Sequence, residues 1–236
     1  GSGKDLHRAE FGEEAGLVTQ TVDGSQIFAG YSGLGGSYFR WYWGFDFTQL
    51  PLNGLVWYPQ GEGPFPIVLI VHGNHVMTAP SDRGYAYLGK HLASQGYIAV
   101  SVDENYLNGV SFLDGNMAEM PLRAWLLLKH LQVWEAWNET EGNPFFGLVN
   151  MQRVALIGHS RGGEAAAIAA AMNWRTAPPV LAVDDGSDFG FAIESVVAIA
   201  PSDGNYKLDN QALTLTHSDY LLLGGGHDGD THALYG

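Results

Sequence analysis

Short runs of mostly apolar residues recur along this chain, and each has the length of a strand buried on both faces. They are residues 54–59, 67–71, 97–102, 154–157, 195–200 and 220–223. Between some of these runs lie longer segments, at 81–94 and 121–137, with the composition of helices. Strands that alternate with helices predict an α/β fold, with a mainly parallel, doubly wound sheet covered by helices on both faces.

The ends and faces of the two long helices can also be predicted. Gly96 follows the segment 81–94 at a position where glycine commonly closes a helix. The segment 121–137 places large apolar residues at helical spacing, which predicts one broad apolar face on an amphipathic helix. Those residues are Leu122, Trp125, Leu126, Leu128, Leu131 and Trp134.

The first fifty residues lack this regularity. They are rich in glycine and aromatic residues and show no clear helical period. Residues 19–24 suit a strand and turn, and the aromatic run 38–43 suits another strand. We therefore predict two regions: residues 1–50 as an N-terminal extension or extra strands packing on the core, and residues 51–236 as the α/β core.

The strongest chemical signal is the sequence Gly158-His159-Ser160-Arg161-Gly162. It follows an apolar strand and precedes an alanine-rich helix former at 164–171, which is the setting of a nucleophile elbow. In such a turn Ser160 would project its hydroxyl group above the strand end, at the positive N-terminus of the following helix. The alternative is a glycine-rich turn whose serine simply caps that helix.

Several segments together resemble the α/β-hydrolase superfamily, in its chain order. They are residues 54–59, 66–74, 96–103, 158–163 and 220–228. Within the superfamily the chain is most similar to the lid-less branch that includes chlorophyllase-like, platelet-activating-factor-acetylhydrolase-like and cutinase-like esterases. The resemblance implies hydrolysis of carboxylic esters without a metal or an organic cofactor.

The resemblance also implies roles for individual residues. Ser160 would be the nucleophile, and the backbone N–H groups of Arg161 and Asn74 would form the oxyanion hole. The side chain of Arg161 is left free to pair with an acid or to lie over the substrate. The acid would be Asp228, with Asp230 and then Asp203 as alternatives. Each of these aspartates could instead bond its own turn backbone.

Further residues are candidates for the surroundings of the site. We expect His75, Tyr106 and Leu107 to line the substrate pocket, together with Trp43. His72 belongs to the His-Gly turn of the family pattern, where it is a structural hydrogen bonder rather than a base.

The catalytic histidine does not fit the family pattern. In this family the histidine follows the acid after a further strand and helix, whereas the chain ends eight residues after Asp228 and only His232 follows. We therefore expect the histidine beyond Gly236, with His232 as a substitute. On this view the last strand and helix of the core are missing. The remainder of the polypeptide or a second chain would then be needed to complete the fold.

Composition limits the partners, the metal sites and the cellular location that the protein can have. The formal net charge of −14 argues against nucleic acid and anionic membranes as partners and favours neutral or cationic ligands. No apolar run is long enough to span a bilayer. There is no cysteine, which excludes disulfides and thiolate metal sites. The few Lys and Arg residues and the many Trp and Tyr residues favour a secreted or extracytoplasmic protein.

These observations lead to one main hypothesis and two alternatives. The main hypothesis is a serine esterase acting on a small-molecule or polymeric ester through Ser160. The alternatives are a catalytically silent α/β-hydrolase-fold binding module, and a peptidase or acyltransferase with the same triad. The cluster of His227, Asp228, Asp230 and His232 could hold a metal, but we expect a solvated turn and no metal site.

Overall fold

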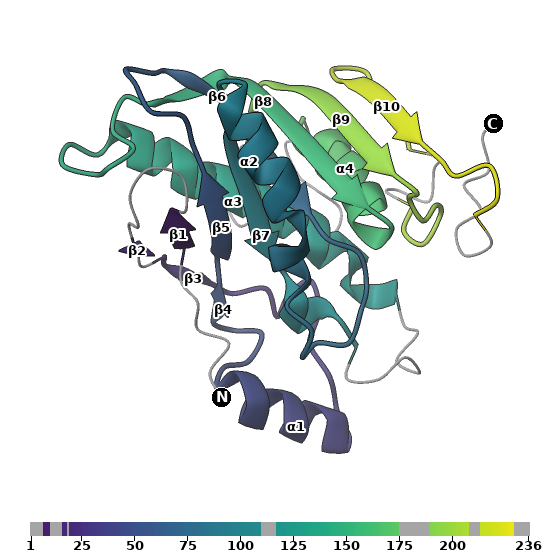
Figure 1. Ribbon diagram of the computed structural model, residues 1–236. Helices are drawn as coiled ribbons and strands as arrows, with labels where there is room; N and C mark the ends of the chain where they lie inside the picture. Colours follow the sequence, from purple (N-terminus) through teal and green to yellow (C-terminus); the bar gives the residue numbers. More distant parts are fainter. Residues whose placement is uncertain are drawn as a thin grey trace.

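The computed structural model describes residues 7–9, 16–17, 19–109, 117–174, 189–207 and 213–228. Its strands are β1 (His7–Ala9), β2 (Gly16–Leu17), β3 (Thr21–Val22), β4 (Leu50–Pro51), β5 (Asn53–Trp57), β6 (Phe65–Val71), β7 (Ile98–Asp103), β8 (Val149–His159), β9 (Ile193–Ile199) and β10 (Asp219–Leu223). Within the described residues, β3 pairs with β4, and the other eight strands form one twisted sheet in the order β10-β9-β8-β6-β7-β5-β1-β2 (Figure 1).

The centre of this sheet is parallel, and its residues explain why. The strands β7, β6, β8, β9 and β10 run in the same direction, while β5 is antiparallel to β7. Side chains such as Leu69 on β6 and Leu156 on β8, which are paired in register, are fully buried. Strands buried on both faces require apolar residues at nearly every position. The predicted α/β fold is confirmed.

Helices cover both faces of the sheet. The helix α2 (Ala86–Ser94), preceded by the 3₁₀ helix η1 (Ser81–Tyr85), lies on one face, and α3 (Met120–Glu139) and α4 (Arg161–Met172) lie on the other (Figure 1). The short 3₁₀ helices η2 (Asn105–Leu107) and η3 (Met117–Glu119) follow β7 and precede α3. Gly96, just after α2, has a φ of 94°, which confirms its predicted role at the end of this helix.

The prediction of a strand at residues 38–43 is wrong, because this run lies in the helix α1 (Gly33–Trp43). Aromatic residues favour strands on average. Here Phe39 and Trp43, four residues apart and thus on one helical face, both insert into the core. Burial of this face outweighs the local preference for a strand. Nearby, β1 joins the main sheet beside β5.

The helix predicted at 121–137 is present, but the prediction that it has a single apolar face is wrong. From Met120 to Trp134, α3 is buried on nearly all sides, and even Arg123 and His130 are inaccessible to solvent. A helix that packs between the sheet and other segments needs apolar residues all round.

The edge of the sheet at β10 is partly apolar and partly exposed. At the edge of the described sheet, Tyr220, Leu221 and Leu223 of β10 are each about half exposed. Among the helices described, none is both long enough and apolar enough to cross a membrane.

Because the parallel strands end at one edge of the sheet, the loops at that edge, including the one at Ser160, form the natural place for a ligand site.

Candidate active site

Ser160 lies in the sharp turn between β8 and α4, and its backbone conformation is unusual. Its φ of 53° and ψ of −125° belong to a region that residues with a side chain rarely adopt. Four backbone hydrogen bonds hold it there. Ser160 N–H donates to Ile199 O (3.0 Å), and Ser160 O accepts from the N–H groups of Gly163 (2.9 Å), Ser202 (3.1 Å) and Glu164 (3.4 Å). The side chain makes no capping hydrogen bond to α4, so the alternative of a capping serine is wrong.

The glycines on either side of Ser160 make the turn possible. A Cβ atom on Gly158 would lie 2.1 Å from the carbonyl oxygen of Gly162, inside any permitted contact. A Cβ atom on Gly162 would lie 2.5 Å from Val71 O and 2.6 Å from His72 O. The start of α4 therefore rests directly on the end of β6. This close packing brings the turn at Ser160, the predicted nucleophile, against the loop that follows β6.

That loop supplies one of the predicted oxyanion donors. A Cβ atom on Gly73 would lie 2.7 Å from Ser160 Cβ, so the backbone of residues 72–74 passes directly beside the serine. Asn74 follows at once, and Arg161 is the first residue of α4. In the described part of the chain, neither the Asn74 nor the Arg161 N–H donates to a backbone carbonyl. An oxyanion donor needs an amide of this kind, so the assignment of Asn74 and Arg161 stays a prediction.

His72 fixes this loop rather than acting as a base. Its Nδ1 is 2.8 Å from Gly73 O, and its Nε2 accepts a hydrogen bond from Glu104 N–H at 3.2 Å. Burial, reinforced by the positive charge of Arg123, lowers the pKa of His72 to about 3, so the ring is neutral. With both ring nitrogens engaged by backbone groups, this histidine has no nitrogen left to take a proton from Ser160.

A buried ion pair lies behind this histidine. Arg123 on α3 contacts Glu104 at 3.2 Å, and both side chains are 0 % exposed. Arg123 also donates to Asn108 Oδ1 at 3.3 Å. Burial raises the pKa of Glu104 to about 8, although Arg123 acts in the opposite direction. Desolvating such a pair is costly. The carboxyl group of the pair belongs to Glu104, the same residue whose backbone N–H group holds His72.

The side chain of Arg161 has a partner of its own. Its Nη1 donates to Glu119 Oε1 at 2.6 Å, and both side chains are largely buried. This confirms the first of the two roles expected for the guanidinium group, pairing with a nearby acid. The ion pair ties η3 to the first turn of α4, beside Ser160.

Glu164, one turn into α4, holds the loop that follows β9. Its Oε1 accepts from the backbone N–H groups of Asn205 (2.7 Å) and Tyr206 (3.1 Å). Its Oε2 accepts from Ser202 Oγ (2.8 Å) and Asn205 Nδ2 (2.5 Å). Because Ser202 N–H also bonds Ser160 O, this loop is fastened to the nucleophile turn at two places. Sequence reasoning did not find this contact.

Replacing Glu164 by alanine should lower the free energy of unfolding by about 2 kcal/mol, because several charge-assisted hydrogen bonds are lost together. Urea denaturation would measure the change. The matched control is Glu194→Ala, which removes a glutamate from an exposed ion pair with Arg153 and should cost less than about 0.5 kcal/mol. Equal effects of the two substitutions would contradict a fastening role for Glu164.

The candidate acids lie on two different loops. Asp228 follows β10, and its N–H group donates to Gly225 O at 3.1 Å in a tight turn. Asp203 follows β9 on the loop that Glu164 holds, next to Ser202. Asp230 and His232 lie outside the described residues. The choice of Asp228 as the acid stays a prediction that rests on its position after the second strand beyond Ser160.

Two exposed histidines lie close to the nucleophile turn. A Cβ atom on Gly73 would be 3.4 Å from His159 Nδ1, and both His159 and His75 are close enough to His72 to affect its pKa. His72, by contrast, has both of its ring nitrogens accounted for by backbone groups. The base stays a prediction.

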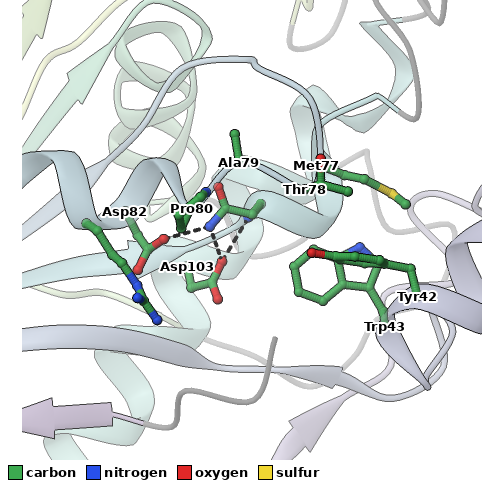
Figure 2. A pocket seen from close by; sticks show the side chains of 10 residues that line it. Tyr42, Trp43, Met77, Thr78, Ala79, Pro80, Asp82 and Asp103 are labelled. Atoms are coloured by element: carbon green, nitrogen blue, oxygen red, sulfur yellow. Dashed lines mark hydrogen bonds between the residues drawn. The ribbon is translucent and has the colours of Figure 1, made fainter. Parts of the chain in front are cut away.

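A pocket of about 70 Å³ lies farther along the same loop, between α1 and the ends of β6 and β7 (Figure 2). Trp43 lines it, and its expected place in a substrate pocket stays a prediction. By contrast, Tyr106 and Leu107 are fully buried in the core, and the Tyr106 hydroxyl donates to Pro51 O at 3.2 Å. Their expected position in the lining is corrected, because both face the core under α1.

The polar wall of this pocket was missed by sequence reasoning. Asn105 Nδ2 donates to Asp82 Oδ1 (2.7 Å) and Asp103 Oδ1 (2.6 Å), as Figure 2 shows. Burial, followed by the charge of Asp82, raises the pKa of Asp103 to about 7. The position of Asp103 and Asn105 just after β7, at the ligand-binding edge of a parallel sheet, could have identified two of these residues.

A mainly parallel sheet with helices on both faces, and a strained serine between its central strand and the following helix, correspond to the α/β-hydrolase fold. A family model described as Chlorophyllase matches residues 46–218, and the chain belongs to this family. Ser160, Arg161 and Asn74 lie within the matched residues, and Asp228 lies beyond them.

Among known proteins, the chain is similar to Chlorophyllase-2 of Arabidopsis thaliana. The two are 26% identical over 159 residues, which represent 66% of this chain and 42% of that relative. The chain thus spans less than half the length of this curated relative.

Proposed function

We propose that the protein is a serine hydrolase that cleaves carboxylic esters through an acyl-enzyme on Ser160. The observation that carries the proposal is the backbone of Ser160, at φ 53° and ψ −125°, with the side chain free of any capping bond. A conformation of this kind costs free energy and persists where function needs it. Membership of the chlorophyllase family supports an ester as the substrate.

The reaction follows from the arrangement of the turn. Ser160 Oγ attacks the ester carbonyl carbon while a histidine takes the hydroxyl proton. The N–H groups of Arg161 and Asn74 stabilise the negative charge that develops on the carbonyl oxygen. The alcohol leaves with the proton from the histidine. Water, deprotonated by the same histidine, then attacks the acyl-enzyme and releases the carboxylic acid.

For the remaining members of the triad we propose Asp228 as the acid and a histidine outside the described residues as the base. Asp228 follows β10, the position at which this superfamily carries its acid. Asp203 is the alternative with the shortest route to Ser160, since its neighbour Ser202 is bonded to the serine carbonyl. Asp228→Asn and Asp203→Asn, compared side by side, would decide between them, because only the true acid fixes the histidine tautomer.

Active-site labelling tests the proposal most directly. A fluorophosphonate should add covalently to Ser160, with loss of fluoride, and tandem mass spectrometry should place the adduct on that residue. Ser160→Ala and heat-denatured protein are the controls, and neither should be labelled. A folded protein that resists the reagent would favour a silent binding module. Labelling together with amide cleavage or acyl transfer, but no ester hydrolysis, would favour the peptidase or acyltransferase alternative.

A further inference from the structure

The helix α1 presents an apolar stripe to solvent. Leu34, Tyr38 and Trp41 lie at successive turns on one side of the helix and are 91%, 39% and 76% exposed. The rings of Tyr38 and Trp41 stack with centroids 5.6 Å apart. The opposite side of α1 is anchored, because Phe39 and Trp43 are buried in the core. The stripe is therefore held on a fixed helix, which distinguishes it from scattered exposed apolar residues.

The segment that carries this stripe is poor in charge. Residues 24–45 contain no Asp or Glu, whereas the whole protein has 25, and the only charged side chain among them is Arg40. A strongly acidic protein repels anionic surfaces. Between Asp23 and Asp46 the segment has none of the carboxylates that would be costly to bring against an apolar phase. The segment thus suits an uncharged, partly apolar partner.

The stripe also adjoins the ligand-binding edge of the sheet. Figure 1 shows α1 at the outer limit of the molecule, beyond the ends of the central strands. Its last residues, Tyr42 and Trp43, line the pocket with Met77 and Asp103 (Figure 2). Met77 lies only three residues after Asn74, a predicted oxyanion donor. A surface bound by α1 would therefore face the same edge as Ser160.

We propose that α1 docks the protein on lipid surfaces with uncharged or zwitterionic headgroups, with Leu34 and Trp41 inserted at the boundary between headgroups and acyl chains. Trp and Tyr favour this boundary because their rings are apolar and carry one polar group. A second copy of the chain is a poorer fit. The three exposed side chains offer on the order of 500 Å², whereas a stable dimer needs about 800 Å² from each partner.

Vesicle flotation tests the proposal without reference to catalysis, so its failure and that of the proposed esterase activity are distinguishable. The protein is mixed with phosphatidylcholine vesicles, and the bound fraction is measured across lipid concentrations. We expect the wild-type protein to float with the vesicles, and the double variant Leu34→Ser, Trp41→Ser to bind at least about tenfold more weakly. High salt should leave the binding unchanged, because charge does not drive it.

The matched control is Trp174→Ser, since Trp174 is an exposed tryptophan two residues beyond the end of α4. It should bind vesicles as well as the wild-type protein does. Absence of wild-type binding, or an equal loss in the control variant, would overturn the proposal. Sedimentation equilibrium of the protein alone provides a second arm: a dimer that the double variant dissociates would show that α1 binds another copy instead.

Discussion

Replacing Ser160 by alanine should lower kcat for an aryl ester such as p-nitrophenyl butyrate by about 10⁴-fold or more, while the fold stays intact. Removal of the nucleophile from a serine triad leaves only the rate enhancement of the oxyanion donors and of substrate binding. Alanine removes only the Oγ atom and keeps the Cβ atom, and the hydrogen bonds that hold the turn come from the backbone of Ser160, so the turn is preserved. Initial rates and circular dichroism of the purified variant would check both parts.

The matched control for this substitution is Ser94→Ala. Ser94 is an exposed serine at the end of α2, and its hydroxyl group donates only to His91 O in its own helix. Its loss should leave kcat and KM within about twofold of the wild-type values. Full turnover by the Ser160→Ala variant, in a preparation free of contaminating esterase, would refute the nucleophile assignment.

The central strands of the sheet could be predicted because one physical requirement, burial on both faces, determines their sequences. Strands buried on both faces must be apolar throughout, so the runs at 67–71 and 154–157 identified β6 and β8 without any other information. The helix α1 could not be predicted in this way. Its aromatic run suits a strand locally, and only the burial of Phe39 and Trp43 in a core made by distant segments selects the helix.

In the site, too, local structure could be predicted from the sequence, whereas contacts between distant residues could not. The elbow is a local structure, so the spacing of Gly158, Ser160 and Gly162 between a strand and a helix was sufficient to predict it. Glu164 has partners 38 to 42 residues away. In the sequence it is an ordinary acidic residue in the first turn of a helix, where acids are common for another reason. Contacts between distant loops leave no pattern in a single sequence.

The loop at Asn74 depends on distant residues in a similar way. The His-Gly turn could be recognised from the sequence, but not what holds it. Glu104 on a different loop and Arg123 on α3 complete the support behind His72. The predicted oxyanion hole is thus built in two parts. One part is the start of α4, set by the local elbow, and the other is a loop held by Glu104 and Arg123, which are buried side chains from elsewhere in the chain.

Gly162→Ala should destabilise the protein severely, by about 3 kcal/mol or more. The added Cβ atom would lie 2.5 Å from Val71 O and 2.6 Å from His72 O, so α4 would have to move away from the end of β6. Both obstacles are backbone atoms of a central strand and its loop, which cannot rotate away as a side chain would. A large fall in the urea midpoint, or failure to fold, is the expected result.

Gly35→Ala is the matched control, since it is the same substitution in a different setting. Gly35 lies in α1, an added Cβ atom would meet nothing within 4 Å, and its backbone is not in the left-handed region. Gly35 is half-buried in the first turn of α1, so this change should leave the stability within about 0.5 kcal/mol of the wild-type value or raise it slightly. A large loss of stability in the Gly162→Ala variant alone would show that the close approach of α4 to β6 fixes the elbow. A Gly162→Ala variant as stable as the wild-type protein would mean that α4 can move without cost, and the nucleophile turn would then have no rigid support.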